Sequence, residues 1–357
     1  MRRVVFAVGA WGLGHATRDL PLIQRLLDAG CQVTVVSTGR ALLLLRRHLG
    51  ERCRFLDLPE TPAPLGRSAL HFYCRCALSL PRMLRVARQE HRFLQELLAR
   101  DPYDCVISDN RYGFSSPWVD SFHVAHGVRA LAPGRNRALE WALEHVAAWV
   151  YRHYDRVIVP DYEEEALAGE LSHGLRFLPR ERLHYIGILS SVRRRPLPED
   201  IDYFVSLSGP EPQRTLLERK LLAQLPALRG RVVVALARPE ECSRSSPRPG
   251  VEVYGFLDRA AQEEMMNRCR LVVTRSGYTT LMELAETERR AVVIPTPGQT
   301  EQEYLARYHG ARGALHAVAQ GRVDLARDVA AAEGTTGLRV PHKTEESVER
   351  FAALVLR

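Results

Sequence analysis

The sequence predicts an α/β protein with two doubly wound parallel sheets, and three observations lead to this fold class. Short apolar runs alternate along the chain with segments of helical periodicity, as in a parallel sheet whose strands are joined by helices. The runs form two series, separated by the charged, proline-containing stretch 190–198. A chain of 357 residues, 46% of them hydrophobic, is also long enough to build two cores.

The expected strands follow from the apolar runs, which are bounded by polar or turn-forming residues. The first series lies at 4–8, 32–37, 54–58, 105–108, 122–126, 156–159 and 183–188, and the second at 203–207, 232–237, 251–256, 271–274 and 291–295. We therefore expect one domain over residues 1–190 and another over 191–340, followed by a C-terminal segment, 341–357, that contains a helix. No short-period repeat interrupts either series.

The first strand leads into a glycine-rich turn, Gly9 to Arg18, and an amphipathic helix that ends near Gly30. Ligands of open parallel sheets bind at such turns. A dinucleotide fingerprint fits poorly, because Thr17 stands where the third glycine belongs and no ribose-binding acid follows the second strand. His15 distinguishes this turn, since an imidazole there can take a proton from a hydroxyl near neutral pH. The alternative is a histidine that only caps the helix.

Two later strand-to-helix turns have the form of diphosphate-binding sites. One runs from Arg275 to Tyr278, and the other occupies 295–302. Small residues at a helix N-terminus let a pyrophosphate approach unpaired N–H groups and the positive end of the helix dipole. Glu283 lies farther along the first of these helices, where its carboxylate can accept hydrogen bonds from both ribose hydroxyls.

Taken together, these motifs resemble the nucleotide-sugar glycosyltransferases of GT-B fold that include the peptidoglycan N-acetylglucosaminyltransferase making lipid II. The resemblance covers nearly the whole chain and rests on Gly12, Gly14, His15 and Arg18, and on 275–277, Glu283, Pro295 and 299–302. Segments 108–113 and 295–304 are similar to a bacterial subgroup of glycosyltransferases whose acceptor is not assigned. The resemblance implies two Rossmann-like domains facing across a cleft. The acceptor would bind mainly to 1–190 and the donor to 191–340, and the last helix would pack on the first domain.

The implied reaction is an inverting, metal-independent transfer of a hexose from a nucleotide diphosphate sugar to a hydroxyl acceptor. His15 would deprotonate the acceptor, and Asp109, which follows the strand 105–108, would orient the imidazole; the alternative role of Asp109 is to cap a turn. The residues expected on the acceptor side are Gly12, Arg18, Asn110, Arg111 and His126. A nucleotide-sugar hydrolase or epimerase of the same fold is the alternative, and a sugar-nucleotide-binding regulator is a third.

The donor is expected to contact the glycine-rich turns of the second domain. Ser208 and Gly209 form a third phosphate-binding turn, where Pro210 removes one N–H donor. Segment 255–257 would recognise the base, with uracil favoured by resemblance and thymine and guanine left open. The complete expected donor set is Gly14, Ser208, Gly209, Gly255, Phe256, Leu257, Arg275, Ser276, Gly277, Tyr278, Thr279, Glu283, Gly298, Gln299, Glu301 and Gln302.

No metal and no cofactor besides this co-substrate is expected. The Asp200-Ile201-Asp202 motif precedes a strand, whereas a metal-binding pair is expected just after one. The seven cysteines form no Cys-x-x-Cys pair and fit reduced thiols. The diphosphate leaving group would instead be neutralised by backbone amides, helix dipoles and basic side chains.

The net charge of +8 does not indicate a nucleic-acid-binding protein. Only Lys220 and Lys343 are lysines, and the many arginines are scattered rather than interleaved with aromatic residues. The exception is 67–92, where arginines alternate with apolar residues. This segment either contacts an anionic membrane and a lipid-linked acceptor, or is an ordinary helix that buries its apolar face. With neither a membrane-spanning run nor a signal sequence, we expect a cytoplasmic protein, with contact at the inner face of the membrane left open.

Overall fold

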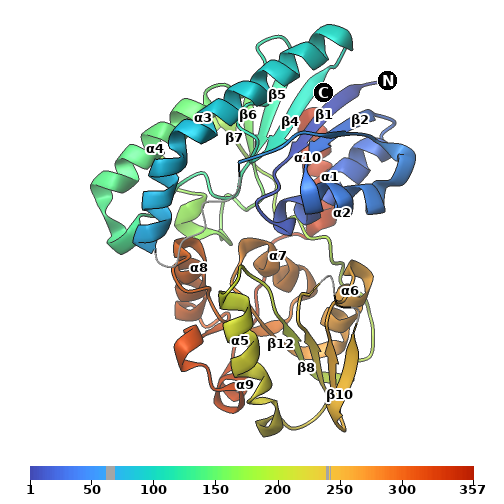
Figure 1. The fold of residues 1–357 in the computed structure, drawn as a ribbon, viewed down its shortest axis with the longest axis vertical. Coiled ribbons are helices and arrows are strands. Elements are labelled where there is room, and N and C mark those ends of the chain that lie inside the picture. The colour runs from blue at the N-terminus through green and yellow to red at the C-terminus, as the bar shows by residue number, and fades with distance from the viewer. Residues whose placement is uncertain (62–68, 239–240, 242) are drawn as a thin grey trace. The chain divides into compact units, whose positions relative to one another are not determined.

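The computed structural model describes residues 1–61, 69–238, 241 and 243–357, and divides the chain into two compact units (Figure 1). Of the described residues, unit 1 comprises 1–61, 70–191 and 341–357, and unit 2 comprises 192–340, to which Ala69 is also assigned. Arg67, the start of the arginine-rich segment, lies outside the described residues. Each unit is built on one seven-stranded sheet.

The sheet of unit 1 is entirely parallel, in the order β3-β2-β1-β4-β5-β6-β7. Its strands are β1 (Arg3–Val8), β2 (Gln32–Ser37), β3 (Arg54–Asp57), β4 (Cys105–Asp109), β5 (Asp120–Val124), β6 (Arg156–Val159) and β7 (Leu183–Tyr185). Val4 to Val8 are fully buried, as expected of a central strand covered by helices on both faces. In the register of β1 with β4, Val8 lies beside Asp109, so the ends of both strands reach the same edge.

The helices of unit 1 alternate with these strands. They are α1 (Leu13–Asp28), α2 (Gly39–Leu49), α3 (Ala69–Arg100), α4 (Arg137–Tyr151) and, from the C-terminus, α10 (Thr344–Val355). Helix α10 packs against α1, and Arg25 of α1 donates to Glu349 of α10 at 2.7 and 2.9 Å. The end of the chain is therefore part of unit 1.

Unit 2 repeats the architecture with the strand order β10-β11-β9-β8-β12-β13-β14. Its strands are β8 (Ile201–Ser206), β9 (Val232–Ala235), β10 (Arg244–Arg248), β11 (Val251–Tyr254), β12 (Cys269–Thr274), β13 (Arg290–Val293) and β14 (His316–Ala317), and only β10 is antiparallel. Its helices are α5 (Gln213–Leu222), α6 (Arg259–Arg268), α7 (Tyr278–Thr287), α8 (Thr300–Ala311) and α9 (Leu325–Glu333).

The predicted fold class is confirmed, because both sheets are parallel or nearly so and every expected strand is present. Two strands were not expected. The strand β10 has the polar sequence RSSPR and lies at a sheet edge, where proline is tolerated, and β14 has only two residues. Neither contains an apolar run, so hydrophobic patterning could not reveal them.

The outer helices of unit 1 leave apolar side chains in solvent. On α3, Leu78 is 82% exposed, and Leu80 and Leu84 are also exposed. On α4 the usual burial is reversed: Glu140 and Glu144 are buried, whereas Trp141 and Trp149 are about half exposed, with Leu139 and Val146 exposed beside them. None of the helices in the described ranges is long and apolar enough to cross a membrane.

Candidate active site

The turn after β1 lies close against the end of β4, because Gly9 has no side chain. Its N–H donates to the carbonyl of Asp109 at 2.8 Å. A Cβ at Gly9 would lie 2.9 Å from the Cβ of Asn110, closer than a side chain permits, and 3.1 Å from that carbonyl, which is tighter than most contacts. This close approach brings the first turns of α1 beside Asp109.

His15 and Asp109 form a hydrogen-bonded pair. The His15 Nδ1 atom lies 2.9 Å from Oδ1 of Asp109, whose side chain is fully buried, while the imidazole is 21% exposed. If Nδ1–H donates to the carboxylate, the lone pair at Nε2 remains available to accept a proton. A partly exposed imidazole held by a buried carboxylate has the arrangement that general-base catalysis requires.

Arg18 joins this pair from one turn further along α1. Its Nε and Nη2 atoms donate to the two oxygens of Asp109 at 2.7 and 2.5 Å, and Nη2 also lies 2.9 Å from His15 Nδ1. Its Nη1 atom is 2.6 Å from Nδ1 of His126, which follows β5. The structure thus brings four of the predicted residues together. Arg18 is buried, so it lies behind the imidazoles and not on the acceptor surface where we expected it.

The charges of the cluster follow from this pairing. Burial acts to raise the pKa of Asp109, but Arg18 and His15 hold it well below its ordinary value, so Asp109 is ionised. The neighbouring Asp19 is also fully buried, and burial, together with the charge of Asp109, raises its pKa well above the ordinary value. Burial and the neighbouring charge therefore favour the uncharged form of Asp19, whereas Asp109 is ionised.

The remaining acceptor-side residues differ in their positions. Gly12 is exposed and forms the N-cap of α1, and Gly14, expected to contact the donor, is partly exposed in its first turn. Asn110 has a left-handed backbone conformation, with φ 58°, directly after Asp109, and its Oδ1 accepts from Tyr112. Arg111 is completely buried and paired with Glu90 at 2.6 Å, so the structure does not bring its side chain to the acceptor side.

One carboxylate at this edge was not expected from the sequence. Glu60 accepts the N–H of Ala10 at 2.6 Å, and the next residue, Thr61, accepts the indole N–H of Trp11 at 2.6 Å. Burial raises the pKa of Glu60 to about 7. Segment 60–61 therefore fixes the turn that carries His15. This segment follows the short strand β3 and contains no recognisable motif, so the sequence did not predict its role.

In unit 2 the centre of the corresponding edge is Arg275, which is 1% exposed. Its guanidinium donates only to backbone carbonyls, those of Ser208 and Gln213 after β8 and of Ile294 and Pro295 after β13, at 3.0 to 3.4 Å. No carboxylate in the described part of the chain pairs with it. Burial lowers the pKa of Arg275 to about 10, so at neutral pH it is a buried cation without a counter-charge.

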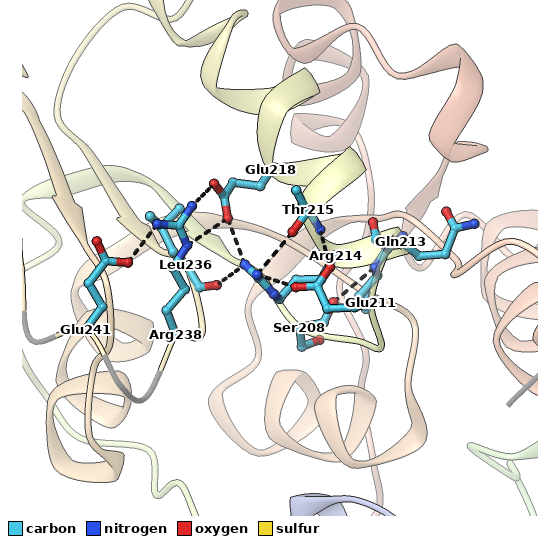
Figure 2. A network of polar contacts seen from close by, with 10 residues as sticks. Ser208, Glu211, Gln213, Arg214, Thr215, Glu218, Leu236, Arg238 and Glu241 are labelled. Carbon is cyan, nitrogen blue, oxygen red and sulfur yellow. Dashed lines mark hydrogen bonds and ion pairs between the residues drawn. The ribbon is translucent and has the colours of Figure 1, made fainter. Parts of the chain in front are cut away.

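Two neighbouring arginines are, by contrast, neutralised (Figure 2). Arg214 on α5 pairs with Glu211 and with Glu218, the latter at 2.7 Å, and Arg238 pairs with Glu218 and with Glu241, the latter at 2.7 Å. These carboxylates satisfy both cations. Arg275 is therefore the cation of this edge that an anion would compensate.

A second unsatisfied group lies beside Arg275. The hydroxyl of Thr296 is buried without a hydrogen-bond partner, and a Cβ at Gly209 would lie 3.5 Å from this hydroxyl and 3.7 Å from Nε of Arg275. Gly209 itself has φ 110°, which side-chain-bearing residues rarely adopt. Thr296 lies within the turn 295–302 that the sequence predicts, but no signal distinguished it from its neighbours; Ser208 and Gly209 lie where they were expected, at the end of β8.

The two helix-opening turns of unit 2 are fastened to each other. The Ser276 hydroxyl donates to the carbonyl of Gln302 at 2.9 Å, and Gly277 is the N-cap of α7. The Gln302 side chain accepts the Thr296 N–H at 2.9 Å and donates to Gln299 at 2.5 Å. Several predicted donor contacts therefore also hold the loops in shape. Of the others, Tyr278 is buried, whereas Thr279, Gly298 and Glu301 are partly exposed.

Glu283 and the expected base-recognition segment are linked through Arg259. Glu283 of α7 is 8% exposed and forms an ion pair with Arg259, the first residue of α6. The N–H and C=O of Gly255 are both bonded to the backbone, to Ser243 and Arg238. Base recognition at this segment would thus fall to Phe256 and Leu257, of which Phe256 is partly exposed. The sequence did not indicate Arg259.

Comparisons with known proteins agree with this arrangement. Residues 224–331 match the family model of the Glycosyltransferase family 28 C-terminal domain. A curated relative from Methylobacterium nodulans, UDP-N-acetylglucosamine–N-acetylmuramyl-(pentapeptide) pyrophosphoryl-undecaprenol N-acetylglucosamine transferase, is 34% identical over 160 residues. This match covers 38% of the chain and 41% of the relative, so it spans about two fifths of either protein.

Solved structures resemble the whole chain at lower identity. The glycosyltransferase of kitacinnamycin has a TM-score of 0.63 at 14% identity, with 99% of this chain and 93% of the other covered. MurG of Acinetobacter baumannii has a TM-score of 0.55 at 15% identity, with 99% and 100% covered. A Listeria monocytogenes protein assigned as a UDP-N-acetylglucosamine 2-epimerase has 0.58 at 14%, with 99% and 95% covered.

The resemblance predicted from the motifs is confirmed by these findings. Structural similarity at this identity establishes the architecture, and the family model identifies the domain in unit 2. The chain therefore has the GT-B fold of two Rossmann-like domains, and its residues 224–331 match the model of the Glycosyltransferase family 28 C-terminal domain.

Proposed function

We propose that the protein is a glycosyltransferase that moves a hexose from a nucleotide diphosphate sugar to a hydroxyl acceptor by inverting displacement. The observation that carries this proposal is Arg275, a buried cation without a counter-charge, at the edge of a family 28 C-terminal domain. A diphosphate bound near Arg275, Gly209 and the N-termini of α7 and α8 would compensate that charge. The curated relative is named for a UDP-sugar donor, which supports UDP over other nucleotides.

The proposed chemistry is a single displacement at the anomeric carbon of the donor. His15 Nε2 removes the proton of the acceptor hydroxyl, whose oxygen attacks the anomeric carbon while the bond to the diphosphate breaks. Asp109 holds the imidazole and stabilises the imidazolium that forms. The negative charge that develops on the leaving diphosphate is stabilised by Arg275 and the helix N-termini, so no residue is assigned to a metal ion.

Hydrolysis or epimerisation of the same donor is the alternative, because an epimerase shares the fold. Water would replace the acceptor in a hydrolase, and His15 would then activate that water. The family 28 match in unit 2 favours transfer. Release of nucleoside diphosphate that depends on an added hydroxyl acceptor supports transfer, and release at the same rate without any acceptor supports hydrolysis.

Calorimetry with a panel of UDP-, dTDP- and GDP-sugars tests the donor assignment. Replacing Glu283 with alanine should weaken the true donor by about 1.5–3 kcal/mol, roughly ten- to a hundredfold, because a charge-assisted ribose contact is lost. Arg259→Ala is the matched control for the ion pair: it leaves the Glu283 carboxylate in place and should cost less. If none of the nucleotide sugars binds, unit 2 is not a donor-binding domain, and the proposal that the protein is a glycosyltransferase is refuted.

We further propose that the exposed faces of α3 and α4 contact an anionic membrane. The two helices lie side by side (Figure 1). The pKa of His153, just beyond α4, is lowered by burial first, then by Arg152, and then by His91 of α3, so the two helices are close enough for these charges to interact. Exposed leucines on α3 and exposed tryptophans on α4 occur together with the exposed Arg82 and Arg85 of α3 and with Arg152, which lies over the ring of Trp149. Tryptophan and arginine are the residues that bind the interface of anionic bilayers, so this face could bring the protein to a lipid-linked acceptor.

Co-sedimentation with vesicles tests this contact. The protein should bind vesicles rich in phosphatidylglycerol at low salt, and much less to phosphatidylcholine alone, because about 1 kcal/mol per arginine comes from the surface potential. Replacing both Trp141 and Trp149 with alanine should abolish most binding. Trp118→Ala is the control, since this indole is 81% exposed but lies outside both helices. Failure to bind anionic vesicles at low salt would refute the membrane contact and favour an ordinary helix over 67–92.

A further inference from the structure

Arg18 touches every other member of the catalytic cluster without being available to a substrate. Its side chain is buried, and its three guanidinium nitrogens are shared among Asp109, His15 and His126. An arginine can only donate hydrogen bonds, so the Nδ1 atom of His126, 2.6 Å from Nη1, must accept. This contact places the proton of a neutral His126 on Nε2. The Nδ1 atom of His15 is 2.9 Å from both Nη2 and Oδ1 of Asp109; because Nη2 has its shorter contact, 2.5 Å, with that same oxygen, we assign the Nη2 proton to Oδ1 and let Nδ1–H of His15 donate to Oδ1 as well.

The same guanidinium limits how strongly Asp109 acts on His15. Both oxygens of Asp109 accept from Arg18, and the oxygen that faces His15 is the one 2.5 Å from Nη2. An unshared carboxylate at 2.9 Å would strongly favour the protonated imidazole, and a protonated imidazole cannot act as a base. Because both oxygens are shared with Arg18, Asp109 can orient the His15 ring while the guanidinium offsets its charge.

We propose that Arg18 is a positioning residue that sets the proton state of both imidazoles, keeping His15 Nε2 able to accept a proton and His126 Nδ1 unprotonated. The inference rests on the proposed transfer reaction for its kinetic consequence, but the proton positions are a property of the protein alone. An arginine is suited to this role, because its planar fork can hold both carboxylate oxygens and still reach an imidazole on each side.

Other charged and titratable groups also face this cluster. Asp19 of α1 lies beside Asp109, and Glu60, in the segment after β3, is close enough to interact with Asp109 electrostatically. His123 of β5 is buried, and burial is the main cause that lowers its pKa to about 4. The charge of Asp109 opposes this shift and those of Arg18 and His15 add to it, so His123 is neutral at pH 7. Burial favours the uncharged form of Asp19, and Glu60 is bonded to the turn. Among the described groups, Arg18 is therefore the cation that offsets Asp109.

The pH profile of kcat/KM tests the kinetic consequence. Replacing Arg18 with methionine should move the acid limb of the profile up by about one pH unit or more, since an opposite charge close to an imidazole shifts its titration by that amount. Activity lost at pH 7 should return in large part near pH 9. A purely structural role would lower the rate equally at all pH values, which would overturn the proposal. Arg25→Met, on the same helix but outside the cluster, should leave the profile unchanged.

Nitrogen-15 NMR of the histidine rings in the wild-type protein tests the proton positions directly. At pH 7 the Nδ1 atom of His126 should give the signal of an unprotonated ring nitrogen, and that of His15 the signal of a protonated one. Arg18→Lys keeps the charge but not the fork, and should release His126 into a mixture of tautomers. A protonated Nδ1 in wild-type His126 would overturn the proposal. Because this readout needs no substrate, it stands or falls separately from the transferase assignment.

Discussion

Replacing His15 with glutamine should lower kcat by about 10²- to 10⁴-fold, the usual contribution of a general base. The side chain of glutamine is neutral at all accessible pH values, so it cannot accept the proton of the acceptor hydroxyl. Donor affinity should change little, because the proposed donor contacts are nearly all in unit 2. The measurement is the release of nucleoside diphosphate in the presence of acceptors, together with calorimetric binding of the donor to the same variant.

The control for His15 is another histidine of unit 1. His91 lies exposed on α3, away from the cluster, and His91→Gln should leave kcat within about twofold of the wild type. A His15→Gln variant that keeps its kcat within tenfold would show that His15 is not the base. The stereochemistry of the product is an independent check, because direct displacement inverts the anomeric carbon and retention would require a covalent intermediate.

The fold could be predicted almost completely because parallel strands buried on both faces leave a strong apolar signal. Strands such as Val4 to Val8 have no polar residue to obscure it. The same reasoning fails at β10, an edge strand with one paired side and the sequence RSSPR, where burial imposes no pattern. Sequence patterning therefore predicted every strand of the unit 1 sheet and the inner strands of the unit 2 sheet, and missed the two edge strands of unit 2, β10 and β14.

The site could be predicted in part, since the carboxyl ends of adjacent strands in a parallel sheet meet at one edge. That rule placed His15 near Asp109, and Arg275 near the turns at Gly209 and Pro295, as the structure has them. It does not say which side chains turn inward. Arg18 and Arg111 were both expected on the acceptor surface, yet each is buried against a carboxylate. Such pairing depends on tertiary contacts that have no signature in local sequence.

Replacing Arg275 with methionine should weaken binding of the nucleotide sugar by about a hundred- to a thousandfold. A unit charge about 4 Å from a diphosphate oxygen contributes about 4 kcal/mol at the effective dielectric of a protein edge. In the ligand-free protein this substitution has two opposing effects on the free energy of unfolding. Removing the cation relieves roughly 3 kcal/mol of desolvation, the free energy that corresponds to lowering its pKa from 12.5 to about 10. However, the carbonyls of Ser208, Gln213, Ile294 and Pro295 lose their donor.

Thermal unfolding with and without UDP separates these effects, because a ligand stabilises only the folded protein and in proportion to its affinity. The Tm of the ligand-free variant should stay near that of the wild type, while the rise in Tm caused by UDP should largely disappear. Arg214→Met is the matched control: this arginine lies near the same loop but is neutralised by Glu211 and Glu218, so UDP should still raise the Tm. An equal loss in both variants would mean that the loop, and not the unpaired charge of Arg275, binds the diphosphate.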